Sequence, residues 1–485
     1  MAIVQNINNL GGANVSLSPF LQPANTPTIL NGCNISYRLG AIQKDCGYER
    51  IGDAASAVKP ITGLFDFRQS SSVQKILRTR NDDTGANLLL QYNNAGTWTN
   101  INVGSTYDAY EDTLTEMEGF LGYCFIVGYD STDNVWLPPA SLTGTTFSTS
   151  VNVTSMPSAK YIKRYRDRLY TLNLYYGGTA YPYRVGMSSV PVAGAIAWTA
   201  TDFLDVDFSE AGTGLGCLWD KLLVFTEKSA YMYDQTQFKK VWDIGGYHRT
   251  ICNHKSTMYF AGPDGLNRST GGDPETISDP IFQLWKTSDP SKWTASIVDE
   301  EYNWYLGACN ANGVNYTNCL ATFNIPTQTW RWRELYHSVS ILTPYLSSGI
   351  RQLYMGTTIG EVYRKGKYTD STLLTSDAGN PIGSYFELAP IFLGNLSFQK
   401  NVTKITTFAE RAMGLKLKAR VVDRSARVLT PYTELGECVQ YVQHHHINMK
   451  SGVLLQIAGY EYGSNPYWSF LGFDFELENV SEVLS

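Results

Sequence analysis

The chain has 485 residues, of which 43% are hydrophobic and 17% are charged, so it can bury a large core beneath a surface that is polar more than charged. Its formal net charge of −6 is small for this length, which argues against a general nucleic-acid binder but leaves room for a local basic patch. The N-terminus lacks the basic region and apolar core of a signal peptide, and no apolar run approaches the roughly 20 residues of a membrane helix, so we expect a protein made in the cytoplasm without a membrane anchor.

Residues 1–55 are expected to form an irregular N-terminal arm. Pro19, Pro23 and Pro27 interrupt regular elements in its first half. The segment then continues through scattered apolar residues to Gly52. A stretch of this kind either packs across other elements or a partner, or extends as a flexible arm.

A short β-motif recurs between residues 56 and 385. An apolar strand rich in tyrosine turns at Gly, Asn or Asp, and a second strand closes near a tryptophan. The motif is clearest at 88–98, LLLQYNNAGTW, and looser at 320–330, LATFNIPTQTW. Units of roughly 40 residues built in this way are typical of radial β-arrays. The sequence therefore predicts a β-propeller of six or seven blades over residues 56–385.

The last hundred residues, 386–485, change in character. Their apolar segments are longer and more regular, at 402–408, 415–422, 452–457 and 470–477. This pattern predicts a C-terminal β-sheet or β-sandwich-like domain. The expected fold class is all-β, because we find no convincing amphipathic helix longer than about ten residues.

Eight cysteines are present, and no two have C-x-x-C spacing. Cys309 and Cys319 flank the turn residues 310–313, so they could face each other across a hairpin and form a disulfide. The alternative is that both are free, half-buried thiols.

No common catalytic constellation is present. The sequence has no P-loop, no G-x-S-x-G elbow and no H-E-x-x-H motif. His444 and His446 would share one face of a strand, yet no carboxylate or Cys is placed to complete a metal site with them. The acidic segments 205–210 and 130–134 offer oxygens for Ca²⁺, or they are ordinary turns. We expect no catalytic residues, no cofactor and no metal.

A propeller hydrolase would need carboxylates that meet in its central channel. Asp299, Glu300 and Glu301 form the most acidic run, but adjacent residues in a strand alternate between faces, so a matched pair is not implied. We therefore expect that the protein is not an enzyme, and we keep a hydrolase as the third hypothesis.

Two basic patterns are the candidate binding residues. One is a local run with Lys163, Arg164 and Arg166. The other is a strand in which Lys416, Lys418 and Arg420 alternate with apolar residues, which predicts one apolar and one cationic face. Both could contact phosphate, such as DNA, or an acidic partner. The alternative is a solvated face or an edge guarded by lysine.

The segment 34–52, NISYRLGAIQKDCGYERIG, carries a resemblance to a known type of protein. Gly40, Gly47, Tyr48 and Gly52 fit a signature found after the N-terminal arm of a β-propeller virion protein of tailed bacteriophages, and Lys44-Asp45-Cys46 stands where that type has an Arg-Pro-Gly run or similar. The later phrases 166–170, RDRLY, and 265–268, GLNR, are similar to recurring blade phrases of the same type. The resemblance covers nearly the whole chain.

The resemblance implies a structural component of the phage tail or neck. Similar proteins form a hexameric nozzle or ring below the portal and adaptor, keep packaged DNA inside and form its exit path. We therefore expect a homo-oligomeric ring in the virion, assembled in the host cytoplasm, with portal, adaptor and other tail proteins as neighbours and packaged DNA in the lumen. The alternative is a receptor- or glycan-binding propeller, in which exposed Trp98 and Trp293 stack on sugars; otherwise these two side chains pack between blades.

Overall fold

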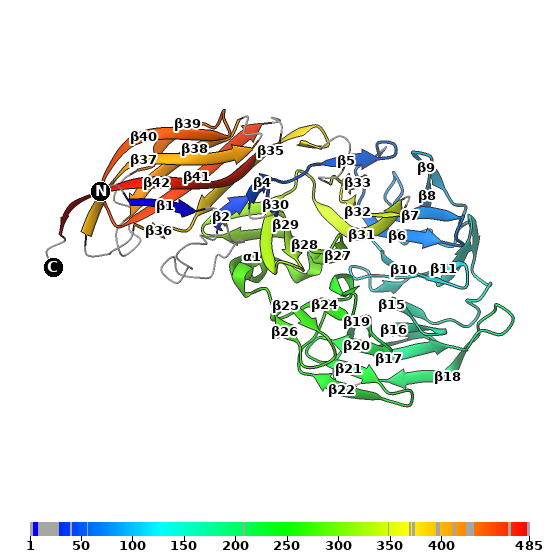
Figure 1. Cartoon of the computed structure of the whole chain (residues 1–485). Helices are drawn as coiled ribbons and strands as arrows, with labels where there is room; N and C mark the ends of the chain where they lie inside the picture. Colours follow the sequence, from blue (N-terminus) through cyan, green and yellow to red (C-terminus); the bar gives the residue numbers. More distant parts are fainter. Residues whose placement is uncertain are drawn as a thin grey trace.

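The computed structural model describes residues 3–7, 29–38, 41–55, 57–206, 209–347, 349–367, 370, 374–393, 398–410, 414–422, 431–463 and 467–482. The protein is all-β, as the sequence predicts, with 63% strand and 4% helix. Two parts are visible in Figure 1: a group of small sheets, and a unit of two layers of longer strands that contains the C-terminal residues.

Among the described residues, seven antiparallel sheets with four main strands each make up the first part. In six of them the main strands pair in chain order, and in the seventh the fourth strand comes from near the N-terminus. Sheet one contains β6 (Ile61–Arg68), β7 (Gln74–Asn81), β8 (Leu88–Asn94) and β9 (Thr97–Asn100); sheet two contains β10 (Leu114–Phe120), β11 (Tyr123–Asp130), β13 (Ala140–Thr143) and β14 (Thr146–Ser148), with β12 (Val135–Trp136) added to β11; sheet three contains β15 (Ser158–Tyr165), β16 (Arg168–Tyr176), β17 (Thr179–Ser188) and β18 (Trp198–Asp205). Sheet four contains β19 (Gly212–Leu218), β20 (Lys221–Thr226), β21 (Ala230–Tyr233) and β22 (Phe238–Trp242); sheet five contains β23 (Cys252–His254), β24 (Thr257–Gly262), β25 (Gly265–Ser269) and β26 (Glu275–Thr276); sheet six contains β27 (Thr294–Val298), β28 (Glu301–Ala311), β29 (Val314–Asn324) and β30 (Thr329–Glu334); sheet seven contains β31 (Val339–Ser347), β32 (Ile350–Thr357), β33 (Val362–Lys365) and β5 (Tyr48–Ile51).

The first strands of these sheets contact one another in a closed circuit. The contacts run from β6 to β10, β15, β19, β23, β27 and β31, and β31 contacts β6 again. The first strands therefore surround a common centre, and the later strands of each sheet lie further out.

The described part of the N-terminal segment is not irregular, contrary to the expectation for residues 1–55, whereas Pro19, Pro23 and Pro27 lie outside the described residues. Its described residues form β1 (Ile3–Ile7), β2 (Ile29–Cys33), β3 (Ile35–Arg38), β4 (Ala41–Lys44) and β5. β5 is the fourth strand of sheet seven and pairs antiparallel with β33, with Tyr48 opposite Lys365 and Ile51 opposite Val362. The prediction was wrong because β1, β2 and β5 pair with strands far away in the sequence, and the local hairpin of β3 and β4 is joined to a sheet by a distant strand that pairs with β4.

The two-layer unit is built from both ends of the chain. Layer A contains β3, β4, β42 (Ser469–Glu482), β37 (Phe398–Glu410) and β40 (Val442–Gly452), with β1 also paired to β42; layer B contains β2, β35 (Asn380–Leu388), β41 (Leu454–Gly463), β38 (Lys416–Val422) and β39 (Thr433–Glu437), with β36 (Ile391–Phe392) also paired to β41. β34 (Ser376–Asp377) pairs with both β5 and β35, so sheet seven continues into layer B. The expected boundary between residues 385 and 386 falls inside β35.

A single buried cluster joins the two parts. Trp304, Trp330 and Trp332 of sheet six belong to the same cluster as Phe386 of layer B and Phe473 of layer A. Burial of aromatic side chains of this size contributes several kcal/mol, at about 25 cal/mol per Å². We infer that the two parts form one packed body.

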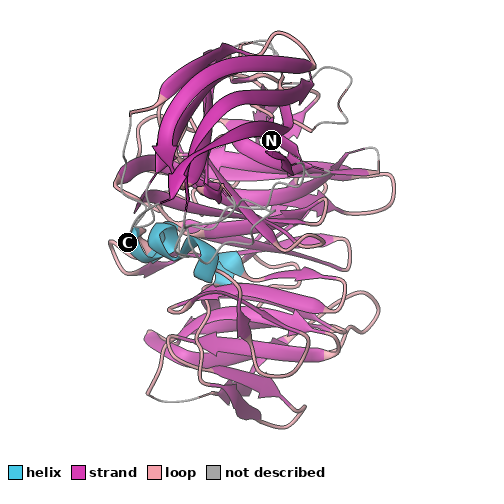
Figure 2. Cartoon of the chain, turned by 60° about the vertical axis from the view of Figure 1, so that its left-hand side comes forward, coloured by secondary structure: helices cyan, strands magenta, loops and turns pink. Residues whose placement is uncertain are grey.

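Helix is scarce, as Figure 2 makes clear. Among the described residues, the helical segments are α1 (Phe282–Thr287) and the three-residue 3-10 turns at His248–Thr250, Asp279–Ile281 and Pro290–Lys292. None of these is long or apolar enough to cross a membrane.

A buried ion pair fastens the N-terminal strands to layer B. Lys44 Nζ lies 2.6 Å from Glu461 Oε2, and both side chains are 1% exposed. The same ammonium donates to the carbonyl of Gly463 at 2.9 Å. Breaking such a pair from one side leaves a buried charge without a counter-ion.

We expect Lys44→Met to destabilise the protein by about 3–5 kcal/mol, because Glu461 would remain buried and unpaired. The double variant Lys44→Met/Glu461→Leu should recover much of this loss. Arg50→Met, which removes an ion pair with Glu361 whose arginine is 46% exposed, is the matched control and should change stability by less than about 1 kcal/mol. Urea denaturation measures the free energy of unfolding of all three variants. An equal loss of stability in the single Lys44 variant and in the double variant would contradict this account.

A second prediction concerns Gly47, which precedes β5. A Cβ there would lie 1.9 Å from the carbonyl oxygen of Ser376, which is backbone and cannot move aside cheaply. We expect Gly47→Ala to cost about 3 kcal/mol or more in the free energy of unfolding. Gly272→Ala, where a Cβ would meet nothing within 4 Å, should be close to neutral in the same measurement.

Candidate functional site

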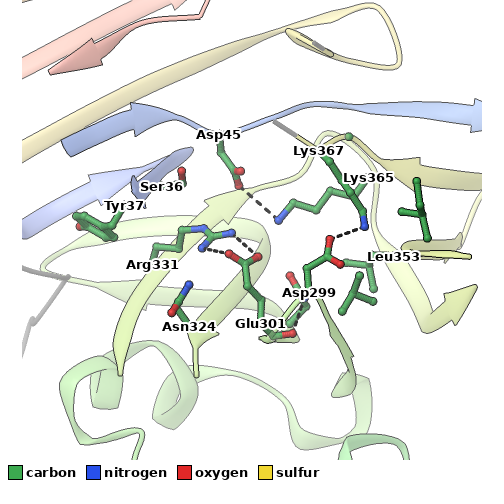
Figure 3. A pocket seen from close by; sticks show the side chains of 14 residues that line it. Ser36, Tyr37, Asp45, Asp299, Glu301, Asn324, Arg331, Leu353, Lys365 and Lys367 are labelled. Atoms are coloured by element: carbon green, nitrogen blue, oxygen red, sulfur yellow. Dashed lines mark hydrogen bonds and ion pairs between the residues drawn. The ribbon is translucent and has the colours of Figure 1, made fainter. Parts of the chain in front are cut away.

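A pocket of about 570 Å³ lies where the N-terminal strands cover sheets six and seven (Figure 3). Ser36 and Tyr37 of β3 line it on one side, and residues of β28, β30, β32 and β33 line the others. It exists because β3 and the residues that follow β4 pass over the sheets to reach β5.

Six charged side chains line this pocket and neutralise one another in pairs. Arg331 donates to Glu301 in a two-pronged geometry, at 2.7 Å for each nitrogen–oxygen pair. Lys365 Nζ lies 3.7 Å from Asp45 Oδ2. The third pair is Lys367 with Asp299. Figure 3 shows the three pairs side by side around the pocket.

Two carboxylates of this cluster, Asp45 and Glu301, are held in their charged form. Burial alone would raise the pKa of Asp45, but Lys365, Arg331 and Arg333 lower it below its ordinary value. Burial would also raise the pKa of Glu301, and Arg331 lowers it below its ordinary value. A general acid needs a carboxyl group that keeps its proton near neutral pH, so neither residue is suited to that role.

Tyr37 contributes a polar group to the lining of the pocket. Its hydroxyl is buried and makes no hydrogen bond with the described residues. Burial raises its pKa well above the ordinary value, so it remains a protonated donor. A polar ligand would meet this hydroxyl together with charges that are already paired, which favours binding over acid–base chemistry.

The acidic run 299–301 lies at the turn between β27 and β28, so the expected alternation of strand faces does not apply to it: Asp299 and Glu300 have φ of 53° and 61°, and Glu301 begins β28. Asp299 and Glu301 line the pocket, whereas Glu300 pairs with Lys255 of the neighbouring sheet at 2.8 Å. Each carboxylate therefore has its own cation, and the run forms no matched acid–base pair.

The centre of the sheet circuit contains two cavities of about 280 and 310 Å³ that share Glu116, His248 and Arg249. Arg249 Nε donates to Glu116 Oε1 at 2.8 Å, and its Nη2 donates to the carbonyl of Thr62 at 3.0 Å. The guanidinium thus reaches from the link between sheets four and five to sheets one and two. It separates the two cavities and closes the centre.

The basic run at 163–166 divides between this centre and the rim around it. Lys163 lines the 310 Å³ cavity and pairs with Glu118 at 3.1 Å. Arg164 lies over the ring of Phe120, with 5.3 Å from its guanidinium carbon to the ring centre. Arg166, in the turn after β15, pairs with Asp220 of sheet four at 3.2 Å.

The basic stripe on β38 has the predicted alternation, with Leu417, Ala419 and Val421 buried. Its cations, however, lie among acids and tyrosines. Arg420 donates to Glu387 at 3.0 Å, and Lys418 lies over the rings of Tyr432 and Tyr460, at 4.7 and 5.3 Å from their centres. Lys416 is exposed and stands opposite Glu437 on β39. The structure does not bring this stripe together with Lys163, Arg164 and Arg166.

The other candidate ligands behave as turn or core residues. His445 is buried between the layers and contacts the carbonyl of Leu435 at 2.8 Å, whereas His444 and His446 lie exposed on the opposite face of β40. Asp130 accepts from the backbone of Thr132 at 2.7 Å, as an ordinary turn residue does. Of the segment 205–210, Asp205 pairs with Arg184, and residues 207 and 208 lie outside the described residues. The described residues contain no group of three or more His, Cys, Asp or Glu that could hold a metal ion.

The two tryptophans proposed to stack on sugars are not free to do so. Trp293 is 4% exposed and packs edge-to-face on Trp304, with ring centres 4.8 Å apart. Trp98 donates to the carbonyl of Ile51 at 3.2 Å, so β5 covers it. The expectation of exposed aromatic turns at these positions was wrong, and both side chains pack between elements instead.

Cys309 and Cys319 are buried free thiols. Within their hairpin Cys309 faces Tyr316 and Cys319 faces Gly307, so the strand register does not set the two directly opposite each other. The alternative of free thiols therefore describes this structure.

Sequence reasoning missed the clusters around Arg331 and Arg249. The segment 330–333, WRWR, contains a signal for the first: two arginines alternate with two tryptophans, and all four residues are buried. A strand buried on both faces that carries two arginines must hold carboxylates nearby. No comparable signal marks Arg249, because its partners come from sheets one and two.

No family model and no curated protein match the chain. Among solved structures, the chain is similar to the AfRom2 CNH domain, at 8% identity and a TM-score of 0.39, over 67% of this chain and 100% of that one. It is also similar to an exo-beta-1,3-galactanase from Phanerochaete chrysosporium solved with galactose, at 8% identity and a TM-score of 0.26, over 90% of this chain and 100% of that one. Likeness this distant decides neither substrate nor activity.

The centre of the circuit should make stability depend on pH. The pKa of His248 is lowered to about 4: burial is the largest cause, Lys163 and Arg249 add to it, and Glu116 opposes it. The unfolded chain, with a histidine pKa of about 6.5, therefore takes up this proton more readily. Stability should fall by about 3 kcal/mol as the pH drops from 7 to 4.

In the His248→Asn variant this part of the pH dependence should disappear. The asparagine side chain still offers an acceptor to the backbone N–H of Leu215, which in the unsubstituted protein donates to His248 Nδ1 at 3.1 Å. Denaturation midpoints at pH 7, 5.5 and 4 measure the pH dependence. His446→Asn, at an exposed position, is the control and should keep the pH dependence of the unsubstituted protein. If the denaturation midpoint depended on pH equally in the unsubstituted protein and in both variants, the role given to His248 would be contradicted.

Proposed function

We propose that the protein is a structural, ring-forming subunit of the tail or neck of a tailed bacteriophage, built as a seven-bladed β-propeller with a β-sandwich attached. The closed circuit of seven four-stranded sheets supports the propeller. The two layers that share one core support the sandwich.

The observation that carries this proposal is the position of the segment that resembles phage virion proteins. Gly47 and Tyr48 lie where β5 enters sheet seven, and a side chain at Gly47 would clash with the backbone. Gly52 has φ +81°, and a Cβ there would lie 2.6 Å from Trp98 Nε1. The matched residues are therefore ones that the junction requires, except Gly40, which lies outside the described residues. A signature that encodes a rigid junction suits an assembly subunit.

The charges also favour a structural role over catalysis. Glu116, which lines both central cavities, pairs with Arg249, and the neighbouring Glu118 pairs with Lys163. The carboxylates of the pocket at sheets six and seven are also paired with cations. A hydrolase needs carboxyl groups whose proton affinities are pushed apart.

We propose that a hexamer of this subunit surrounds the packaged DNA, with the portal, the adaptor and other tail proteins as neighbours. The DNA would pass through the lumen of the assembled ring and not through the centre of one subunit. Cavities of about 280 and 310 Å³ separated by Arg249 are far too small for a duplex.

The mass of the native assembly tests this proposal. Complexes released from intact phage particles should contain six copies of the 54.0 kDa chain together with portal or adaptor protein, as measured by native mass spectrometry. Absence of the chain from purified particles, or its release as a compact monomer without neighbours, would refute the assignment.

The second candidate function is a receptor- or glycan-binding propeller. Trp98 and Trp293 no longer support it, because both are packed. It stays a candidate because a different aromatic cleft, at the junction of the two parts, has the features of a carbohydrate site.

A further inference from the structure

A cleft of about 530 Å³ separates sheet six from layer B. Thr317, Asn318 and Glu334 of sheet six line one wall, and Gly383 and Tyr385 of layer B line the other. Its volume lies in the range of small-ligand sites, about 300–1,000 Å³, which are frequent where two parts of a protein meet.

Two tyrosines at this cleft are unusually exposed. Tyr336, which follows β30, is 60% exposed, and Tyr462 on β41 is 75% exposed. Tyr336 packs edge-to-face on His337, with ring centres 4.8 Å apart, and Tyr462 lies beside Gly383, yet most of the surface of both side chains stays open to solvent. Tyr460 lies 5.4 Å from Tyr462 between ring centres and extends the aromatic surface along the strand.

The walls between these rings are held in place by hydrogen bonds. Asn34 donates to the carbonyl of Gly383 at 2.6 Å and accepts from the backbone of Glu334 at 3.0 Å, so it bridges the two walls. Tyr385 shares a hydrogen bond with Tyr316 of sheet six at 2.8 Å. The cleft is therefore formed before any ligand arrives, which reduces the entropic cost of binding.

The charge of the cleft selects the class of ligand. Among the described residues that line it there is no lysine or arginine. Asp377 is neutralised by Arg333 at 2.5 Å, which leaves Glu334, whose Oε1 accepts from the backbone of Thr317 at 2.9 Å. Phosphate, acidic sugars and acidic peptides would find no cation here. A neutral ligand that offers both apolar C–H faces and hydroxyl groups fits the two rings and the polar groups between them.

We propose that this cleft binds a neutral oligosaccharide segment. The pyranose faces stack on Tyr336 and Tyr462, and the Glu334 carboxylate and the Thr317 hydroxyl form hydrogen bonds with sugar hydroxyls. The proposal gives the second candidate function a specific site. It does not rest on ring assembly, because every lining residue belongs to one chain.

The test uses native gels cast with soluble mannan, glucan, galactan or xylan. At least one of these polysaccharides should retard the purified chain, and Tyr336→Ala/Tyr462→Ala should weaken that retardation at least about tenfold, since both rings are contact residues. Tyr336→Phe/Tyr462→Phe should retain most of it, because the stacking faces remain. Tyr441→Ala removes a tyrosine that is 61% exposed away from the cleft and should behave as the unsubstituted protein.

Three outcomes would overturn the proposal. One is no retardation by any of the four polysaccharides, and another is an equal loss in Tyr441→Ala. The third is binding of an oligolysine peptide with the same dependence on Tyr336 and Tyr462, which would assign the cleft to a basic peptide. The substituted tyrosines are exposed, so unchanged melting temperatures should exclude misfolding as a cause. A hexamer that forms normally from Tyr336→Ala/Tyr462→Ala chains would separate this site from assembly.

Discussion

The pairing of β5 with β33 is the contact on which the rest of the structure depends. It completes sheet seven and brings residues from opposite parts of the chain together: Arg364 Nε donates to Glu49 at 2.7 Å across 315 positions of sequence. The entropy cost of such a long closure is modest, because each doubling of loop length adds only about 0.6 kcal/mol, so 315 residues cost about 2 kcal/mol more than 40. A few buried contacts at the closure are enough to offset it.

Those contacts are mostly charged, and this choice has a physical consequence. Arg333 is 1% exposed and lies 2.5 Å from Asp377 and 3.6 Å from Asp45. Burying ions is costly, and apolar residues of the same volume would often be as stable. Ion pairs do, however, define register: a shift of β5 by one residue would turn Tyr48 away from the core and separate Asp45 from Lys365. We infer that the charges fix how the N-terminal strands dock more than they add stability.

Local patterns in the sequence were sufficient for the all-β class and for the two faces of β38. They failed wherever a structure is completed by a distant segment. β5 reads as irregular because its pairing partner is more than 300 residues away. Local sequence does not show that Trp98 is covered, because the strand that packs over it, β5, comes from a distant part of the chain. Arg249 carries no local signal, since its acceptors Glu116 and Thr62 lie on the far side of the circuit. The aromatic cleft was missed for the same reason, because Tyr336 and Tyr462 come from different parts of the chain.

Most of the features that the sequence did not predict lie at or beside the N-terminal strands. Arg249 blocks the centre of the sheet circuit, and the charged side chains there are paired with one another, so they hold the sheets together. The N-terminal strands, in contrast, both close the circuit and shape the surface beside it. Asn34 lies between β2 and β3 and holds the two walls of the cleft at once, through Gly383 and Glu334. The walls of the cleft are held by the same N-terminal segment that completes sheet seven, so the rigidity of the cleft depends on the pairing of that segment. The shape of this cleft therefore depends on correct docking of the N-terminal strands. A ligand bound there would meet a preformed surface only in a chain whose fold is complete.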